Sequence, residues 1–231
     1  MKTLLSLLIS FTLLIPATSI LAQNVDTLNA EGQRLIDQGK YAEALEAYKK
    51  AVKLKPDYWF SYKNAGWVLT YKLNRPQDAL PYYQKAIELN PDEPISFLEI
   101  AATFMDLKNW ENCAEFYIRA LDIYKRQNKT PMGSWIYTRL ADILRDRLNK
   151  KDEALKYLLE GSKIFKNEPG IYFSIAGIYK SLEKFNEALS YYNNAFLLSG
   201  KQYVIPSVWN LIYASDIIFY KQNRHNEGID Y

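Results

Sequence analysis

A nine-residue pattern recurs along the chain, and its spacing constrains the fold more than any other feature of the sequence. The copies read KYAEALEAY, RPQDALPYY, NWENCAEFY, KKDEALKYL and KFNEALSYY, and they begin at residues 40, 75, 109, 150 and 184. A sixth, RHNEGIDY, begins at Arg224, so that successive starts are 35, 34, 41, 34 and 40 residues apart. A period near 34 with two insertions is typical of an array of helical repeats.

Each repeat has the periodicity of two amphipathic helices. In the first repeat, small and apolar residues recur three and four positions apart in two runs, separated at Gly39 and closed by Pro56. Small residues in both runs, such as Gly32 and Ala44, allow the two helices to approach closely, and Tyr48 fills the space around the contact. The pattern therefore predicts an almost wholly helical chain without a sheet.

The packing positions resemble those of the tetratricopeptide repeat (TPR) family. The second repeat has the family pattern at Tyr62, Ala65, Gly66, Leu69, Ala79, Tyr83, Ala86 and Pro91. The resemblance extends over nearly all of the chain that follows the N-terminal segment, and it implies an all-α superhelix (solenoid) of about five and a half helical hairpins. The expected repeats are 25–58, 59–93, 94–127, 134–168, 169–202 and a truncated sixth at 208–231.

The N-terminal segment, residues 1–22, has the layout of a secretory signal peptide. A lysine precedes the apolar run Leu4–Ile15, and small residues lead to Ala22, after which we expect cleavage, with Ser19 the weaker alternative. Cleavage leaves a repeat array at 23–231, without a membrane span, in the secreted or periplasmic space. An uncleaved anchor is the other interpretation. No cysteine follows the apolar run, so a lipoprotein anchor is excluded.

The scarcity of histidine and cysteine argues against most familiar catalytic chemistry. The chain has one of each, Cys113 and His225, so a catalytic triad, a Cys/His dyad or a zinc site would depend on a single histidine. We therefore expect no enzyme, no metal site and no cofactor, although two carboxylates could still form an acid/base pair. Cys113 occupies a small-residue packing position and is expected to be buried. The net charge of +3 is too balanced for a dedicated nucleic-acid binder.

The TPR resemblance implies a binding groove lined by one stripe of each first helix. That stripe carries unusually large apolar residues in the second and third repeats, and exposed patches of this kind are typical of binding surfaces. The alternative is that these side chains pack against neighbouring helices. The expected groove residues are Phe60, Lys63, Asn64, Trp67, Tyr71, Leu98, Met105, Arg145 and Phe173.

Two known binding motifs, a carboxylate clamp and a phosphate-binding loop, are absent from the sequence. Leu98 and Ala102 stand where chaperone-docking members of the family have basic residues that clamp a carboxylate, so that clamp is broken. No glycine-rich phosphate loop is present in the sequence. Four carboxylates lie near the groove, and we expect them to be ordinary solvated helix residues: Glu99, Asp106, Asp142 and Asp146.

Three classes of function are compatible with these features. The first is a scaffold of the cell envelope or secreted space that binds a protein or peptide in the groove. The second is an adaptor or sensor region of a larger protein. The second helix of the sixth repeat has only about seven residues, which are too few for a stable helix. We therefore expect the native protein to continue beyond residue 231. The third is a glycan-binding module that stacks sugars on Trp67 and Tyr71.

Overall fold

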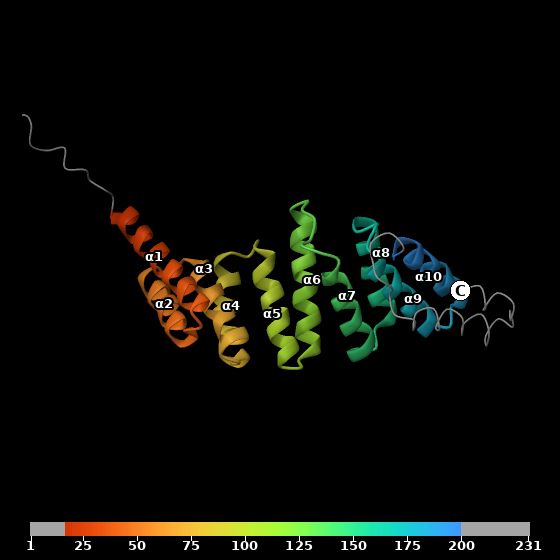
Figure 1. The fold of residues 1–231 in the computed structure, drawn as a ribbon, viewed down its shortest axis with the longest axis horizontal. Helices are drawn as coiled ribbons and strands as arrows, with labels where there is room; N and C mark the ends of the chain where they lie inside the picture. Colours follow the sequence, from red (N-terminus) through yellow and green to blue (C-terminus); the bar gives the residue numbers. More distant parts are fainter. Residues whose placement is uncertain (1–16, 200–231) are drawn as a thin grey trace, which may run out of the picture. The chain divides into compact units, whose positions relative to one another are not determined.

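The structure, a computed structural model, describes residues 17–199, and their side chains from residue 24 onward. Within these residues the chain forms helices and turns and no strand, which confirms the expected all-α class (Figure 1). The elements are α1 (Ala17–Asp37), α2 (Tyr41–Leu54), α3 (Trp59–Trp67), η1 (Val68–Lys72), α4 (Pro76–Leu89), α5 (Pro94–Asp106), α6 (Trp110–Arg126), α7 (Trp135–Asp142), η2 (Ile143–Arg147), α8 (Lys151–Ile164), α9 (Pro169–Ser181) and α10 (Phe185–Ser199). Residues 1–16 of the predicted signal peptide and the truncated sixth repeat at 208–231 lie outside the described residues, and both stay predictions.

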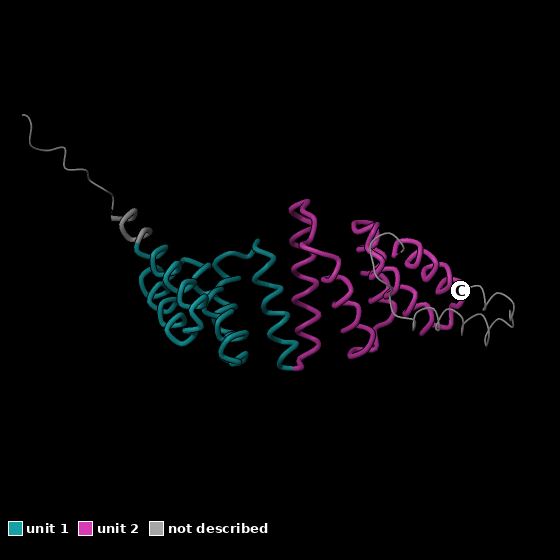
Figure 2. The backbone as a smooth tube through the Cα atoms, in the orientation of Figure 1, with its two compact units in different colours: residues 1–107 teal, residues 108–231 magenta. Residues whose placement is uncertain are grey.

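The chain divides into two compact units, residues 1–107 and 108–231 (Figure 2). The division falls between α5 and α6, which are the two helices of the third repeat. In unit 1, each helix from α1 to α5 packs against the next along the chain, and in unit 2 the same holds from α6 to α10. Three helices, α4, α5 and α9, begin with proline, which suits the first turn because the N–H group that proline lacks has no helical acceptor there.

In three hairpins, a glycine on one helix packs against the ring of a tyrosine on the other. In unit 1, a Cβ atom at Gly66 would lie 2.9 Å from the ring of Tyr83, and in unit 2 one at Gly161 would lie 2.7 Å from the ring of Tyr137. Both tyrosines are buried. Cys113 is also fully buried, which confirms the packing role predicted for it.

The turn between the two helices of every hairpin contains one residue in the left-handed region. In the first turn it is Gly39, with a φ of 73°, and the next residue, Lys40, donates its backbone N–H to the Leu35 carbonyl at 2.8 Å. The equivalent residues are not glycine, yet they have φ values of 52° to 58°: Asn74, Lys108, Asn149 and Glu183. The turn geometry is therefore common to all five hairpins and does not depend on glycine.

The first helices of the second and fourth repeats contain one residue more than the others. Asn74 lies eight positions after Gly66, whereas Gly39 lies seven positions after the equivalent Gly32. The fourth repeat has the same extra residue before Asn149. A regular α-helix would carry this excess into the turn and rotate the second helix away from its packing position.

The extra residue is accommodated by a π-helical turn in each case. In η1 the Leu73 N–H donates to the Val68 carbonyl at 3.0 Å, and in η2 the Leu148 N–H donates to the Ile143 carbonyl at 3.1 Å, both five residues back. Single π-helical turns of this kind are often found at functional sites.

Candidate functional site

The expected groove residues of the second repeat form a connected set on α3 and η1. The Lys63 ammonium lies 4.8 Å from the centroid of the Phe60 ring and 5.4 Å from that of Trp59. One helical stretch further on, the Trp67 and Tyr71 rings are in tilted contact, with centroids 5.6 Å apart. These side chains retain access to solvent, because Tyr71 is 44% exposed and the others are half-buried.

A carboxylate on the next first helix, Glu99 of α5, connects the two ends of this set. The Tyr71 hydroxyl donates a hydrogen bond to it, and the positive charge of Lys63 acts on it from α3. Burial is nevertheless the dominant effect and raises the pKa of Glu99 above its usual range. We call this set the unit-1 face, and it consists of Phe60, Lys63, Trp67, Tyr71 and Glu99.

A layer of buried hydroxyl groups lies close to Glu99. The Thr70 and Thr103 hydroxyls are 3.3 Å apart, and Thr103 also donates to the Glu99 backbone carbonyl at 2.8 Å. Tyr83 is fully buried nearby, and burial raises the pKa of its hydroxyl far above the usual range, so that the group stays protonated. Glu99 thus lies between these buried hydroxyl groups and the solvent-accessible rings of the unit-1 face.

The other expected groove residues of unit 1 are placed less favourably for binding. Leu98 is only 6% exposed and belongs to the core, so the expectation of a solvent-facing side chain there is wrong. The reason is that α5 is buried over most of its circumference rather than along one stripe, with a buried run that includes Ser96, Phe97 and Leu98 in succession. Asn64 and Met105 are half-buried.

In unit 2, the expected groove residue Arg145 is held by carboxylates of its own helix. Its guanidinium donates to Asp146 at 2.6 Å and 2.7 Å and to Asp142 at 2.9 Å. Arg145 holds the pKa of Asp146 below its usual range, whereas burial raises the pKa of Asp142 despite the same neighbour. Arg145 is therefore already neutralised and is poorly suited to receive an anionic ligand.

Phe173, the last expected groove residue, lies between the core of unit 2 and a shallow hollow. Its ring meets that of Phe196 edge-on, with centroids 5.4 Å apart. The hollow has a volume of about 320 Å³, and Trp135, which is 43% exposed, lines it together with Phe173. Its other lining residues are Ser134, Thr138, Glu168, Pro169, Gly170 and Ser199. Sequence reasoning did not select Trp135, which lies two residues after the insertion at 128–133, a segment with the sequence NKTPMG.

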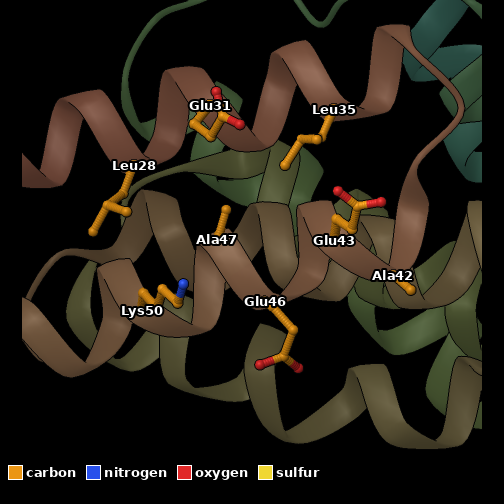
Figure 3. A pocket seen from close by; sticks show the side chains of 8 residues that line it. All are labelled: Leu28, Glu31, Leu35, Ala42, Glu43, Glu46, Ala47 and Lys50. Atoms are coloured by element: carbon orange, nitrogen blue, oxygen red, sulfur yellow. The ribbon is translucent and has the colours of Figure 1, made fainter.

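A second hollow, of about 470 Å³, opens between α1 and α2 in unit 1 (Figure 3). Figure 3 shows Leu28 and Leu35 of α1 directed toward Ala47 of α2, with glutamate side chains around them. Two of these carboxylates are paired within their helices: Glu31 with Arg34 and Glu46 with Lys49. This hollow therefore combines an apolar floor with a solvated, already paired rim.

The outer face of the first repeat is charged at Glu31, unlike the equivalent position of the later repeats. The equivalent positions in the following four repeats are apolar and at most 2% exposed: Ala65, Ile100, Leu140 and Ile175. Glu31 is half-buried, and Arg34 lowers the pKa of its carboxyl. Terminal repeats of helical arrays typically have such a polar outer face.

Sequence reasoning missed two features of the site. The first is Glu99, which we expected to be a solvated helix residue and which is instead half-buried. The second is η1, which places Tyr71 beside Glu99. The spacing of 35 instead of 34 between the first two copies of the repeated pattern is the signal that could have revealed the π-helical turn.

Between residues 17 and 199, no helix has the length and apolar character needed to cross a membrane. No group of three or more His, Cys, Asp or Glu side chains in that part of the chain is arranged to hold a metal ion.

Comparisons with known proteins agree with the geometry. Three family models, each described as tetratricopeptide repeat, match residues 29–94, 93–167 and 169–202. The comparison with curated proteins gave no match. Stacked hairpins with this spacing define a helical-repeat protein, and the chain belongs to the tetratricopeptide repeat family.

Solved structures of TPR proteins resemble this chain in fold. MamA is 17% identical over 80% of this chain and 100% of its own, with a TM-score of 0.67. PilF of Pseudomonas aeruginosa is 14% identical over 90% of both chains, with a TM-score of 0.63. YrrB, described as a TPR protein with an unusual peptide-binding site, is 19% identical over 80% of this chain and 90% of its own, with a TM-score of 0.62. These similarities confirm the all-α superhelical fold class, and at such identities they show the fold alone.

Proposed function

We propose that this protein is a non-catalytic scaffold that binds a protein or peptide on the unit-1 face. The observation that carries the proposal is the connected set of rings and charges on α3, η1 and α5. Aromatic residues with accessible faces are the residue types that dominate binding energy at protein interfaces. A role in protein–protein interaction also agrees with the TPR family and with the peptide-binding site for which YrrB is described.

The unit-1 face supports this function better than the other candidate surfaces do. Arg145 in unit 2 is occupied by Asp142 and Asp146, and the carboxylates Glu31 and Glu46 beside the α1/α2 hollow are paired within their own helices. The Trp135 hollow of unit 2 is the second candidate, because it places an exposed indole ring beside Phe173.

The experiment is a selection of peptides from a random library on the immobilised protein, followed by calorimetric titration of the selected sequences. Trp67→Ala removes a ring of the unit-1 face, and Trp135→Ala is the matched control in unit 2. We expect Trp67→Ala to weaken binding by about tenfold or more, as for a central interface aromatic. Trp135→Ala should bind like the wild type. No enrichment of any peptide, or equal affinity for Trp67→Ala, would count against the proposal, and enrichment of glycans in a parallel array would favour a sugar ligand.

We further propose that the protein acts outside the cytoplasm, which rests on the signal-peptide pattern of residues 1–22. The N-terminal sequence of the protein recovered from its native cells tests this. A mature N-terminus at Gln23 is expected, whereas recovery of the intact Met1 N-terminus in the soluble cytoplasmic fraction would contradict it.

A further inference from the structure

One oxygen of the Glu99 carboxylate accepts no hydrogen bond from any described residue. Tyr71 donates to the carboxylate, yet the Oε2 atom is buried and has no hydrogen-bond partner in the part of the chain that the structure describes. An acceptor left unsatisfied in a protein interior has a free-energy cost, and each such atom calls for an explanation. Glu99 lies at the edge of a solvent-accessible set of rings, so a hydrogen-bond donor brought by a ligand would explain the unsatisfied acceptor.

No cation among the described residues pairs with Glu99, although two lysines lie over rings of this region. The Lys63 ammonium lies over the Phe60 and Trp59 rings, and the Lys72 ammonium lies 5.1 Å from the Trp67 ring centroid and 5.5 Å from that of Tyr41. Among the residues that the structure describes, no ammonium or guanidinium group forms an ion pair with Glu99. Cations therefore already lie over the ring faces, whereas Glu99 has no ion-pair partner among the described residues.

Rings and a carboxylate side by side make a site for one chemical class of ligand. A planar guanidinium can stack on an aromatic face and donate to a carboxylate oxygen at the same time, and an ammonium can do the same with less directional contacts. An anionic group would be repelled by Glu99, and a neutral side chain would leave its charge unpaired. Glu99 is half-buried, so part of its side chain is accessible from the solvent side.

We propose that the unit-1 face receives an arginine or lysine side chain of the bound peptide, with Glu99 as its anionic partner and Trp67 and Tyr71 as the stacking surface. This inference rests on the proposed peptide-binding function and specifies the chemistry of its ligand. Tyr71 has a double role here, since it offers its ring to the cation and its hydroxyl fixes one oxygen of Glu99.

The test uses three small probes on the full-length protein: N-acetyl-arginine amide, its neutral isostere N-acetyl-citrulline amide, and N-acetyl-glutamate amide. The readout is the indole N–H signal of Trp67 in NMR titrations, assigned with Trp67→Phe. We expect a saturable shift with the arginine probe and binding of the citrulline and glutamate probes at least about tenfold weaker. Equal binding of arginine and citrulline overturns the proposal on the wild-type protein alone, without any variant.

Two variants then locate the anionic partner. Glu99→Gln keeps the shape of the side chain, and we expect it to weaken binding of the arginine probe by about tenfold. Glu111→Gln, which changes an exposed carboxylate of α6, is the control and should bind like the wild type. Unchanged binding by Glu99→Gln overturns the proposal. If selected peptides lose affinity for Trp67→Ala but not for Glu99→Gln, the scaffold function stands and only the cationic ligand is wrong.

Discussion

At the scale of single residues, the close approach of α3 and α4 in unit 1 depends on the absence of a side chain at Gly66. A Cβ atom there would meet ring atoms of Tyr83 at 2.9 Å, and this ring is fully buried and has no room to move away. We expect Gly66→Ala to lower the free energy of unfolding by about 1–3 kcal/mol through overpacking. Urea denaturation followed by circular dichroism measures the change.

Gly177 provides the control for that prediction, because it also lies within a first helix. A Cβ atom at Gly177 would meet no atom within 4 Å. Gly177→Ala should therefore be neutral or stabilise by up to about 1 kcal/mol, the difference in helix propensity between the two residues. Similar losses of stability in both variants would show that the Gly66–Tyr83 contact is not the cause.

Glu99 gives the stability of the protein a dependence on pH. Because burial raises its pKa in the folded state above the value of about 4.3 in an unfolded chain, the folded state binds the proton more tightly. This contribution to stability is present at acidic pH and is lost as the pH rises through the folded-state pKa. The charged groups that act on the carboxyl are Lys63, which opposes the shift, and Glu93, which adds to it.

Glu99→Gln removes this titration, so we expect the variant to be more stable than the wild type at neutral pH. The difference should become smaller as the pH falls below about 4, where the wild-type carboxyl becomes protonated in both states. Urea denaturation of both proteins across this pH range measures it. A difference that does not change with pH would mean that Glu99 ionises in the folded protein as easily as in the unfolded chain.

At the scale of elements, η1 connects a one-residue insertion to the geometry of the unit-1 face. Deletion of Lys72 should return this helix to α-helical geometry and turn the residues on either side of the deletion by about 100° relative to each other. Tyr71, which lies within the π-helical turn, would then shift relative to Glu99 of α5. We expect the deletion to weaken peptide binding by about tenfold while the helical circular dichroism signal is retained.

The matched control is deletion of Arg147 in η2, which makes the same backbone change in the fourth repeat. Peptide binding on the unit-1 face should be unaffected by it. If both deletions weaken binding equally, the effect is a general loss of repeat structure and the π-helical turn has no specific role in positioning Tyr71.

The helices could be predicted from the sequence because their packing residues repeat with a helical period in every unit. Gly39 also marked a helix end, but the same left-handed turn at Lys108 and Glu183 has no signal in the residue type. In those turns the backbone geometry is imposed by packing of the two helices, which outweighs local preference. Leu98 and Glu99 were misjudged for a related reason, since their exposure depends on how much of α5 its neighbours cover.

At the scale of the whole molecule, stability should be distributed unevenly along the array. Repeats interact mainly with their neighbours, so the free energy of unfolding is close to a sum of local contributions. We expect hydrogen exchange to show different protection in different repeats, with a step near the insertion at 128–133, where the regular spacing is interrupted. A single uniform protection level across the described helices would contradict this.

The charged outer face of the first repeat also bears on how copies of this protein can associate. A helix that docks there from another molecule would have to remove Glu31 and its partner Arg34 from water, at the desolvation cost of two charges. Contacts that join unlike surfaces can add copies without limit and produce fibres, so a charge at this position restrains open-ended growth. Glu31→Leu should therefore cause association that increases with protein concentration, measurable by analytical ultracentrifugation, whereas Glu46→Leu on the neighbouring helix, at a more exposed position, should have the smaller effect.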